Sequence, residues 1–470
     1  MLRTVVIAGV LVAGCKGHRD DKPVAPPAGS AAGSAIAATC PTGEREGSLA
    51  WIRDDYAGAL ACAKSKHVPL VLDLWAPWCH TCLSMQTTVL VDPSFAADAN
   101  KFVFASLDTD KDVNAPAQAK LAISAWPTFY VVGDDETVMA RFVGAASLAQ
   151  FHGFLDAGAK AVAGGALAVD AHLLGAERAL AVKDLATADT ELTAAIAAAP
   201  ADWPRKPDVL GSLILTKSKR GDLAGCLDLA EQNLAATGNA AVASDFLVTA
   251  MDCADTAEKA KKLDGKLIEK VRKDAAARWK QLLGDSSAQL SVDDRSDAMA
   301  SLRDTMDKLG DKAGAKAIAE QQAKLLDDTA AKAPSPLAAM TYNWPRAEVY
   351  VYLGRPLDLV PALEKSAADL PKEYDPPARL GWLYWKANKL SEAAQWTDKA
   401  LALAYGPRKA RLLGMRADIA KAAGDVAAEK DFRGKAIAQY ESLPKGEEMP
   451  DALAAAKAAL AATSGAGSAG

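Results

Sequence analysis

The apolar residues between positions 48 and 163 occur in short runs that alternate with helical patterns. Four runs have the length and composition of buried strands. They are residues 68–74, "FVFASLD" at 102–108, "AWPTFYVVG" at 125–133 and "TVMARFVG" at 137–144. Helical patterns cover residues 54–66, the segment that opens at Cys79, residues 92–100 and 115–122, and a closing segment from Ser147. The order β-α-β-α-β-β-α predicts an α/β domain over residues 39–165, with a mixed sheet and helices on both faces.

Beyond Gly165 the strand patterns end, and Ala-rich helical patterns continue almost to the last residue. Two segments, 352–371 and 385–405, align with Gly354 and Asn388 34 positions apart, which is the period of the tetratricopeptide (TPR) repeat. Residues at the small and aromatic positions extend the resemblance to the TPR pattern, and the small ones let paired helices approach closely. In the unit 374–407 they are Gly381, Tyr384, Ala393 and Ala400, and in a weaker unit at 173–200 they are Ala176, Ala188, Ala195 and Pro200.

Gly-Asp pairs at 221–222, 310–311 and 424–425 are typical of turns between paired helices. The sequence therefore predicts an irregular all-α, TPR-like solenoid of about five to seven helix pairs over residues 166–462. Segments 254–290 and 325–340 fit the repeat poorly. The alternative is a generic Ala-rich helical bundle.

Composition supports this division and excludes one class of partner. The 470 residues exceed an ordinary single core, so we expect more than one folding unit. Half of the residues are apolar but only 6% are aromatic, a balance that favours closely packed helices. The formal net charge is −5, without the stripe of Lys and Arg that is typical of nucleic-acid-binding proteins. Nucleic acid is therefore not an expected partner.

Residues 1–15 have the pattern of a secretory signal. The apolar run Val5–Gly14 is too short to span a membrane permanently. It ends in Val12-Ala13-Gly14-Cys15, which resembles the bacterial lipobox and implies cleavage before Cys15 and lipidation of its sulfur. We therefore expect an extracytoplasmic (periplasmic) protein, anchored by lipid to the inner or the outer membrane. The alternative is an ordinary cysteine buried in a signal peptide. Residues 16–38 are predicted to form a flexible tether and residues 463–470 a disordered tail.

Six cysteines remain after Cys15, an even number in a compartment where disulfides persist. Sequence order suggests three pairs, Cys40–Cys62 and Cys226–Cys253 as structural disulfides and Cys79–Cys82 as a redox pair. The first cysteine of a Cys-x-x-Cys at a helix start lies beside free backbone N–H groups and the positive end of the helix dipole. Because both favour the thiolate, Cys79 is the expected nucleophile and Cys82 the resolving thiol.

Two alternatives for the Cys79–Cys82 pair are a metal site and a purely structural disulfide. Zinc requires four ligands, but the chain has no second Cys-x-x-Cys and its five histidines form no pair at helical spacing. A disulfide that closes so short a loop restricts the unfolded chain little. We therefore expect neither a metal nor a cofactor. Between the cysteines, His80 either stabilises the thiolate when it is protonated or faces solvent.

Residues 48–163 resemble the thioredoxin fold. The resemblance depends on residues that stand in family order and at family spacing: Asp73, Trp75, Trp78–Cys82, Trp126–Thr128 and Gly144. The stretch "ALACAKSKHVPLVLDLWAPWCHTC", with "VLVDPSF" after it, is most similar to the electron-delivering C-terminal domain of DsbD-type thiol:disulfide interchange proteins. This similarity favours reduction of disulfides over their formation.

The resemblance also implies roles for the flanking residues. Asp73 would accept the proton of the resolving cysteine, and burial on an apolar strand would raise its pKa. The alternative is an aspartate at a strand end that faces water. Trp126, Pro127 and Thr128 resemble the cis-proline loop, which together with Trp78 would contact an incoming peptide. The alternative for Pro127 is a trans proline that begins a strand.

These features predict a membrane-anchored thiol-disulfide oxidoreductase, a protein-disulfide reductase by its resemblance, whose helical repeats dock a protein partner. Its expected partners are protein thiols or disulfides and a membrane-embedded or soluble electron donor. The alternative function is a TPR-based holdase chaperone or assembly scaffold with a secondary redox domain, because chaperedoxins also join these two modules.

Overall fold

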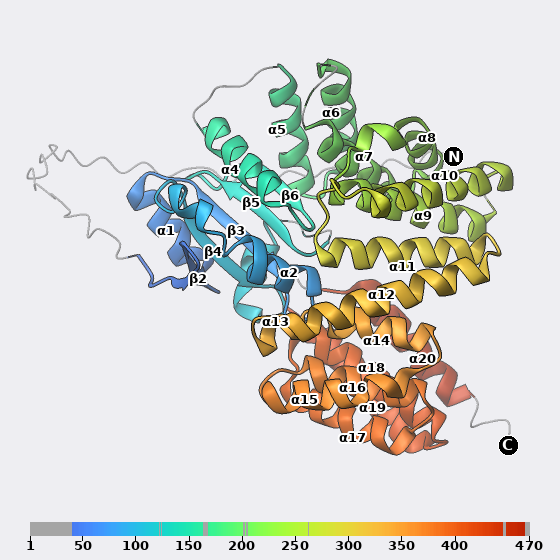
Figure 1. Cartoon of the computed structure of the whole chain (residues 1–470). Coiled ribbons are helices and arrows are strands. Elements are labelled where there is room, and N and C mark those ends of the chain that lie inside the picture. Colours follow the sequence, from blue (N-terminus) through green and yellow to red (C-terminus); the bar gives the residue numbers. More distant parts are fainter. Residues whose placement is uncertain are drawn as a thin grey trace, which may run out of the picture. The chain divides into compact units, whose positions relative to one another are not determined.

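The computed structural model describes residues 40–121, 123, 125–162, 168–200, 203, 205–261, 263–444 and 448–465 (Figure 1). The predicted signal peptide, Cys15 and the tether over residues 16–38 lie outside the described residues. Within the described ranges, no helix combines the length and the apolar character needed to cross a membrane.

A six-stranded mixed sheet comes first, with the strand order β1-β2-β4-β3-β5-β6. The three central strands β2, β4 and β3 run parallel, whereas β1, β5 and β6 each pair antiparallel with their inner neighbour. The strands are β1 (Glu44–Glu46), β2 (Leu49–Arg53), β3 (Leu70–Trp75), β4 (Val103–Asp108), β5 (Thr128–Val132) and β6 (Val138–Val143). Strands β3 to β6 confirm the four predicted strands and the mixed sheet.

The hairpin of β1 and β2 is absent from the sequence prediction, which placed no strand before residue 68. Strand β1 has three polar residues and β2 only five residues, so neither contains a long apolar run. Gly47 joins them with a left-handed φ of +55°, and a Cβ there would lie 2.4 Å from the carbonyl oxygen of Val91. The burial of Leu49 and Trp51 on alternate positions anchors β2 in the core.

Helices cover both faces of the sheet, as predicted. The helical segments of this domain are α1 (Tyr56–Lys66), α2 (His80–Ser84), the π-helical continuation η1 (Met85–Val89), η2 (Pro93–Ala97), η3 (Asp112–Asn114), α3 (Ala115–Gln118) and α4 (Leu148–Val162). Helices α1 and α3 pack on the face that contains Leu72 of β3, whereas η1 and α4 pack on the face that contains Val71. Since side chains alternate along a strand, Asp73 shares the face of Val71 and points toward the helix that carries the cysteines.

The rest of the described chain is helical, and short loops join successive helices. Neighbours pack as pairs, among them α5 with α6, α7 with α8, α11 with α12, α16 with α17 and α18 with α19, and α20 packs on α19. This run of helix pairs is the predicted all-α solenoid. The helical segments are α5 (Ala168–Ala181), α6 (Leu185–Ala198), α7 (Lys206–Arg220), α8 (Leu223–Asn233), η4 (Leu234–Thr237), α9 (Ala241–Ala260), α10 (Gly265–Gly284), α11 (Val292–Lys308), α12 (Lys312–Lys332), α13 (Pro336–Met340), α14 (Asn343–Tyr352), η5 (Pro356–Leu359), α15 (Val360–Asp369), α16 (Asp375–Lys386), α17 (Leu390–Leu403), α18 (Gly406–Ala422), α19 (Val426–Glu441) and α20 (Pro450–Gly465).

The predicted Gly-Asp turns all lie between paired helices. The glycines have left-handed φ values of +74°, +85° and +74° at Gly221, Gly310 and Gly424. Each following aspartate caps the next helix, because its carboxylate accepts the N–H three residues later; these are Asp222, Asp311 and Asp425. Gly354 and Asn388, which the aligned segments share, are also left-handed. A positive φ and a cap therefore account for the recurring turn signal.

Two details of the helical region differ from the prediction or go beyond it. The poorly fitting segments, 254–290 and 325–340, lie mostly in α9, α10 and α12, which have 20, 20 and 21 residues. Helices of this length do not keep a 34-residue period. Thr463, predicted to begin a disordered tail, instead belongs to α20, and its hydroxyl donates a hydrogen bond to Glu429 of α19. Residues 466–470 lie outside the described residues.

The structural disulfides join the cysteines that sequence order suggests. Cys40 and Cys62 link the segment before β1 to α1, with an S–S distance of 2.04 Å. Cys226 and Cys253 link α8 to α9, with an S–S distance of 2.08 Å. The second disulfide therefore connects the second helix of one pair to the first helix of the next.

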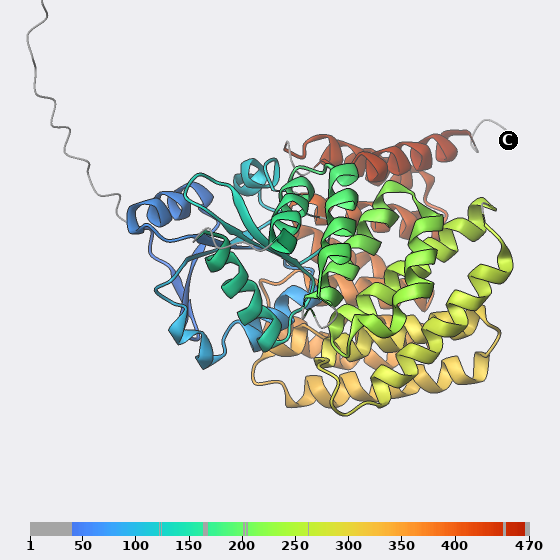
Figure 2. The same ribbon diagram turned by 90° about the horizontal axis from the view of Figure 1, so that it is seen from above.

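The sheet and the helical pairs contact one another directly, and all described residues belong to one compact unit. Helix α5 packs on strand β6, and both views show these two elements next to each other (Figures 1 and 2). At the end of β4, the Tyr405 hydroxyl before α18 donates a hydrogen bond to Asp108. A Cβ on the adjacent Gly406 would lie 2.3 Å from the backbone oxygen of Asp110. The carboxyl ends of the central strands, where the cysteine motif lies, therefore contact the repeats.

Candidate active site

The two cysteines of the redox motif form a disulfide where β3 leads into α2. Cys79 is the N-cap of α2, and the backbone N–H of Cys82 lies 3.0 Å from its Sγ. This N–H and the positive end of the helix dipole would stabilise a thiolate on Cys79 after reduction. Cys79 is 5% exposed and Cys82 is 1% exposed. The outer sulfur therefore belongs to Cys79, as the motif predicts, but very little of it is accessible.

Asp73 lies buried on β3, with 2% of its surface exposed. Its Oδ2 accepts hydrogen bonds from Gln86 Nε2 at 3.2 Å and Ser106 Oγ at 3.1 Å, and its Oδ1 has no hydrogen-bond partner among the described residues. Burial raises the pKa of Asp73 to about 6, although both hydrogen bonds act in the opposite direction. Gln86 follows Cys82 by one helical turn, so the two share the helix face toward Asp73. The carboxylate is therefore buried below the cysteines and does not face water.

The segment that resembles a cis-proline loop has that conformation: the Trp126–Pro127 peptide bond is cis. The Thr128 hydroxyl donates to the carbonyl of Ala125 at 2.7 Å, and the Gly144 N–H donates to the carbonyl of Pro127 at 2.9 Å. The Trp126 ring packs against the cysteines in one apolar cluster, together with Trp75 and Trp78. The structure therefore brings the residues that carry the thioredoxin resemblance to one place.

Trp78 lies between the redox motif and the repeats. Its Nε1 donates to Asp110 Oδ2 at 3.0 Å, and its ring meets Trp126 edge to face with centroids 5.0 Å apart. The same ring packs against an apolar cluster of α16 to α18, and the Arg408 guanidinium lies 4.8 Å from its centroid. Trp78, which was predicted to contact substrate, therefore contacts the helical region.

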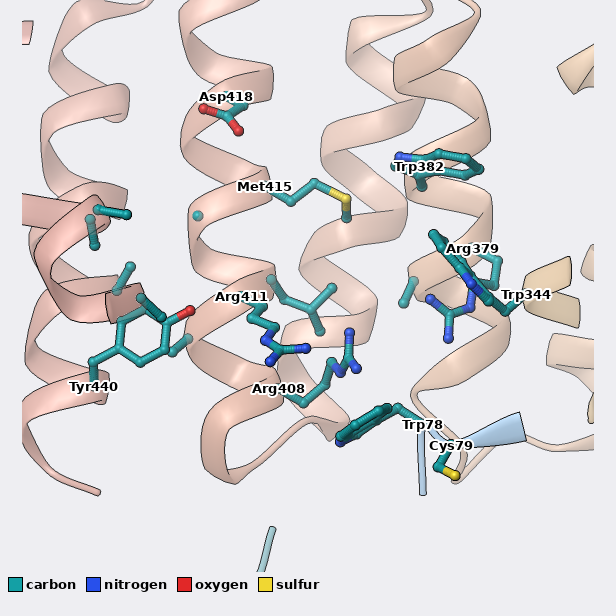
Figure 3. Close-up of a pocket in the computed structure, with 18 of the residues that line it drawn as sticks. Trp78, Cys79, Trp344, Arg379, Trp382, Arg408, Arg411, Met415, Asp418 and Tyr440 are labelled. Carbon is teal, nitrogen blue, oxygen red and sulfur yellow. The ribbon is translucent and has the colours of Figure 1, made fainter. Parts of the chain in front are cut away.

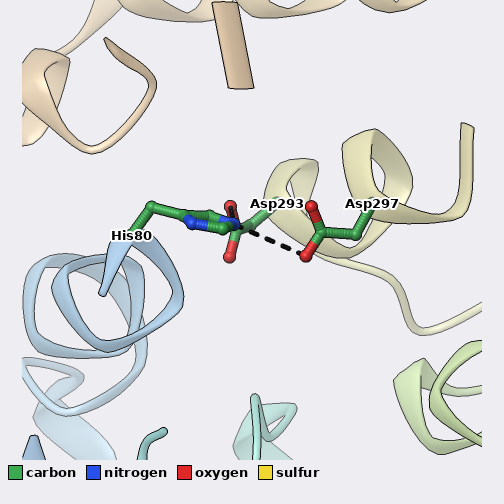
Figure 4. A group of neighbouring side chains, drawn as sticks. All are labelled: His80, Asp293 and Asp297. Atoms are coloured by element: carbon green, nitrogen blue, oxygen red, sulfur yellow. Dashed lines mark ion pairs between the residues drawn. The ribbon is translucent and has the colours of Figure 1, made fainter. Parts of the chain in front are cut away.

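His80, the residue after Cys79, does not face open solvent. Its Nε2 lies 3.3 Å from Asp293 Oδ1 and 3.4 Å from Asp297 Oδ2, both on α11 (Figure 4). Burial lowers the pKa of His80, but the two carboxylates outweigh this effect and raise it to about 10. Burial also raises the pKa of Asp293, which is 1% exposed. The imidazolium is thus neutralised by α11, which weakens its pull on a Cys79 thiolate.

The same three side chains bear on the prediction that no metal binds. Their ligand atoms, one from each of His80, Asp293 and Asp297, all lie within 4.8 Å of one another, a spacing that a metal ion could bridge. The prediction considered only ligand pairs within one helix, whereas these residues come from α2 and α11. The ion pairing of a charged His80 with the carboxylates accounts for this spacing. A metal would instead require the neutral imidazole.

A cavity of about 1050 Å³ opens in front of the disulfide, between the cysteine motif and α14 to α20 (Figure 3). Cys79, His80 and Thr81 form its floor on the thioredoxin side. Five of the chain's ten tryptophans line it: Trp78, Trp126, Trp344, Trp382 and Trp385. Its arginines are Arg379, Arg408, Arg411 and Arg433. The route from solvent to the Cys79 sulfur therefore runs past side chains of the repeats.

Sequence reasoning missed the charged residues that the repeats contribute to this site. Asp293 pairs with His80, and Arg408 and Arg411 flank Trp78, although they stand far from the cysteine motif in the chain. One local signal does exist: α18 begins with basic residues and has no acidic residue in its first turn. Cations at a helix N-terminus oppose the helix dipole, so such a pattern indicates a constraint other than helix stability.

Comparisons with known proteins agree with the sheet domain. Residues 55–157 match the family model described as Thioredoxin. Among solved structures, a tetratricopeptide repeat protein from Parabacteroides merdae is 15% identical, with a TM-score of 0.40 over 63% of this chain and 98% of that chain. The TPR2AB domain of yeast Sti1, solved in complex with pHSP90, is 12% identical, with a TM-score of 0.25 over 63% and 98%. Because both TM-scores are below 0.5, the assignment of repeats depends on the helix pairs and turns described above.

Proposed function

We propose that this protein is a membrane-anchored, extracytoplasmic protein-disulfide reductase whose helical repeats bind the protein that carries the substrate disulfide. The thioredoxin match supports thiol-disulfide exchange in general. The finer assignment to reduction is supported by the sequence similarity to the electron-delivering domain of DsbD-type proteins. The observation that carries the proposal is the Cys79–Cys82 disulfide at the start of α2, with a buried carboxylate below it and a cavity in front of it.

The reaction begins from the dithiol. The Cys79 thiolate attacks one sulfur of the substrate disulfide, and a Cys79–substrate bond forms while the other substrate sulfur leaves as a thiolate and takes a proton. Cys82 then gives its proton to Asp73 and attacks the Cys79 sulfur. The Cys79–Cys82 disulfide forms, and the second substrate thiolate leaves. Two electrons have passed to the substrate, and an external dithiol donor must return them before the next cycle.

Substitution of the resolving cysteine tests this reaction. Cys82→Ser should accumulate mixed disulfides through Cys79, which are visible as reductant-sensitive adducts on non-reducing gels. The double variant Cys79→Ser/Cys82→Ser should form none. As a matched control, Cys226→Ser/Cys253→Ser, which removes a disulfide distant from the motif, is combined with Cys82→Ser. This triple variant should trap the same adducts, because Cys79 alone forms them. Absence of adducts, together with no dithiol-dependent reduction of insulin by the wild type, would refute the proposal.

The direction of transfer is tested by the reduction potential of the Cys79–Cys82 couple, measured against glutathione or dithiothreitol buffers. A reductase requires a potential near that of thioredoxin, about −270 mV, whereas an oxidant has a potential near that of DsbA, about −120 mV. A value near the second would overturn the assignment to reduction and leave thiol-disulfide exchange intact.

The anchor and the location are part of the proposal and are supported by the lipobox-like residues at 12–15. Cys15→Ser should release the full chain from the membrane fraction and abolish incorporation of labelled fatty acid in a bacterial host. If the variant fractionates as the wild type does, the lipid anchor is wrong.

A holdase or scaffold is the second candidate. It is favoured by the three cavity tryptophans that come from helices and not from the thioredoxin domain, Trp344, Trp382 and Trp385. In that function the full chain with Cys79→Ser/Cys82→Ser would suppress aggregation of an unfolded protein as well as the wild type does. Loss of suppression in this variant would reject the second candidate and leave the reductase.

A further inference from the structure

The cavity in front of Cys79 contains two arginines whose charges are not matched by ion pairs. Arg379 pairs with Asp375 at 2.5 Å, and Arg433 pairs with Asp418 at 3.0 Å and with Glu429. Arg408 and Arg411 form no salt bridge with a carboxylate in the part of the chain that the structure describes. The Arg408 Nε has no hydrogen-bond partner there, and Arg411 hydrogen-bonds the Tyr440 hydroxyl. The charges of two cavity-lining guanidiniums are therefore not neutralised by direct ion pairs, and both can attract an external anion.

The surroundings of Arg408 and Arg411 add to the positive potential. Both belong to the first turns of α18, whose N-terminus has no side-chain cap and no acidic residue. The positive end of the helix dipole therefore adds to their charge. Asp110 attracts both guanidiniums, but its carboxylate already accepts the hydrogen bond from Trp78 Nε1. Asp110 thus faces both guanidiniums and a helix N-terminus, and Asp418, Glu448 and Asp451 also line the cavities that Arg408 and Arg411 line.

These cations stand next to the reacting sulfur. The Arg408 and Arg411 guanidiniums lie 4.8 Å and 5.7 Å from the centroid of Trp78, the residue that precedes Cys79 (Figure 3). The tryptophans beyond them supply flat apolar surfaces along the same cavity. A ligand that reaches Cys79 therefore passes two guanidiniums that have no salt-bridge partner among the described residues, and several aromatic rings.

The shape of the site selects among anionic ligands. Because Cys79 is only 5% exposed and lines the cavity, an extended segment reaches its sulfur more easily than the convex surface of a folded domain does. The volume of about 1050 Å³ is at the upper end of small-molecule pockets, about 300–1,000 Å³, and suits several residues of an extended chain.

We propose that the cavity binds an extended, acidic segment of a substrate protein, with Asp or Glu side chains near its disulfide held by Arg408 and Arg411. This inference rests on the proposed reductase function, because it names the substrate class of the same site. Recognition is by charge-assisted hydrogen bonds from the guanidiniums, which suit carboxylates. Folded proteins whose disulfides lie in basic or neutral surroundings are then poor substrates.

Three matched peptides test this assignment, each with one internal disulfide flanked by Glu, Gln or Lys. For the binding arm, fluorescein-labelled versions with serine in place of cysteine are titrated with the oxidised full chain and followed by anisotropy. The Glu peptide should bind about tenfold more tightly than the Gln peptide and lose this advantage as salt is raised. For the kinetic arm, kcat/KM for reduction of the disulfide peptides should follow the same order.

Arg408→Gln and Arg411→Gln should each reduce the preference for Glu over Gln several-fold, while Arg416→Gln should not. Arg416 is the matched control, since it lies on the same helix but pairs with Asp398 outside the cavity. Equal binding of the three peptides, an equal effect of Arg416→Gln, or tighter binding of glutathione disulfide than of the Glu peptide would overturn the assignment. If no peptide is reduced, the reductase function fails, but the binding arm still decides what the cavity recognises.

Discussion

Asp73 is almost completely buried and lies below the redox disulfide. Asp73→Asn keeps the shape of the side chain but cannot accept a proton from Cys82. We expect the rate of disulfide reduction at pH 7 to fall about hundredfold, because a positioned proton acceptor contributes at least this much. The wild-type rate should rise with pH through about 6, where Asp73 becomes a carboxylate, and the variant should lack this rise. Insulin reduction measured from pH 5 to pH 9 checks both.

The control for this experiment is Asp98→Asn. Asp98 is also buried in the thioredoxin domain, but it contacts Lys101 and His152 and not the cysteine motif. It should keep the rate and the pH profile of the wild type. A wild-type profile in Asp73→Asn would contradict the role of Asp73 as proton acceptor.

The raised pKa of Asp73 also has a consequence for stability. The unfolded chain releases this proton near pH 3.8 and the folded chain near pH 6, so the free energy of unfolding falls as pH rises between these values. Above pH 6 the full cost of the buried charge is present, about 3 kcal/mol. Asp73→Asn removes this cost and should therefore be more stable than the wild type at pH 8 but not at pH 4. Urea unfolding at the two pH values measures the difference, and equal stability at pH 8 would contradict the burial of a charged carboxylate.

His80 is held as an imidazolium by carboxylates of α11. Its raised pKa stabilises the contact between α2 and α11 at neutral pH, an effect that is lost as pH rises toward 10. Asp293→Asn should lower the pKa of His80 toward its ordinary value, about 6.5. NMR of the imidazole ring between pH 6 and pH 9, assigned with His80→Gln, should show a titration in the variant and none in the wild type. Asp304→Asn, on the same helix but paired with Arg303, is the control. A wild-type His80 that titrates near 6.5 would contradict the ion pair.

Helices α16 and α17 approach each other closely at Gly381. A Cβ on Gly381 would lie 2.5 Å from Thr397 Oγ1, so Gly381→Ala forces the two helices apart. We expect a loss of about 1–3 kcal/mol in the free energy of unfolding, as is typical of overpacking. Since α16 carries Arg379, Trp382 and Trp385, tryptophan fluorescence of the cavity should change as well.

Gly434→Ala is the matched control for Gly381→Ala. No atom lies within 4 Å of a Cβ at Gly434, which is in the middle of α19. Alanine stabilises a helix relative to glycine by about 0.5–1 kcal/mol, so this variant should be slightly more stable than the wild type. If both variants behave alike in urea unfolding, the close approach at Gly381 is not a structural constraint.

The elements themselves were predictable where their signals are local. The strands β3 to β6 have continuous apolar runs. In each Gly-Asp turn, two adjacent residues supply the left-handed φ and the cap of the next helix. The hairpin of β1 and β2 was missed because its strands are short and one consists of polar residues, so it is stabilised by tertiary contacts, namely the pairing of β2 with β4 and the burial of Leu49 and Trp51. The end of α20 was missed for the same kind of reason, because Thr463 is ordered by Glu429 of another helix.

The thioredoxin domain and the repeats meet beside the cavity in front of Cys79, so we expect this contact to limit access to the sulfur. At Gly406, with φ of +53°, a Cβ would lie 2.3 Å from the backbone oxygen of Asp110, so Gly406→Ala should separate the two parts at the edge of the cavity. The reduced variant should then react with iodoacetamide at Cys79 several-fold faster than the reduced wild type. Mass spectrometry of the alkylated peptide measures the rate.

Gly424→Ala separates this effect from backbone strain. Gly424 also has a left-handed φ, +74°, but no atom lies within 4 Å of its Cβ position. Its alkylation rate should equal that of the wild type. Equal rates in all three proteins would mean that the contact at Gly406 does not cover the sulfur.

The redox motif and the repeat turns follow from neighbouring residues, because helix starts, strand runs and caps are local interactions, whereas the role of Asp73 and the cis-proline segment were predicted from the resemblance to thioredoxin. The composition of the cavity does not follow from neighbouring residues, since it depends on which surfaces meet. Tyr405 and Asp108 are 297 residues apart, and no periodicity or motif relates them. The carboxylates that neutralise His80 and the arginines beside Trp78 lie next to the cysteine motif only because the helical pairs pack against the end of the sheet. Local sequence specifies the chemistry at Cys79, and long-range packing specifies which molecules can reach it.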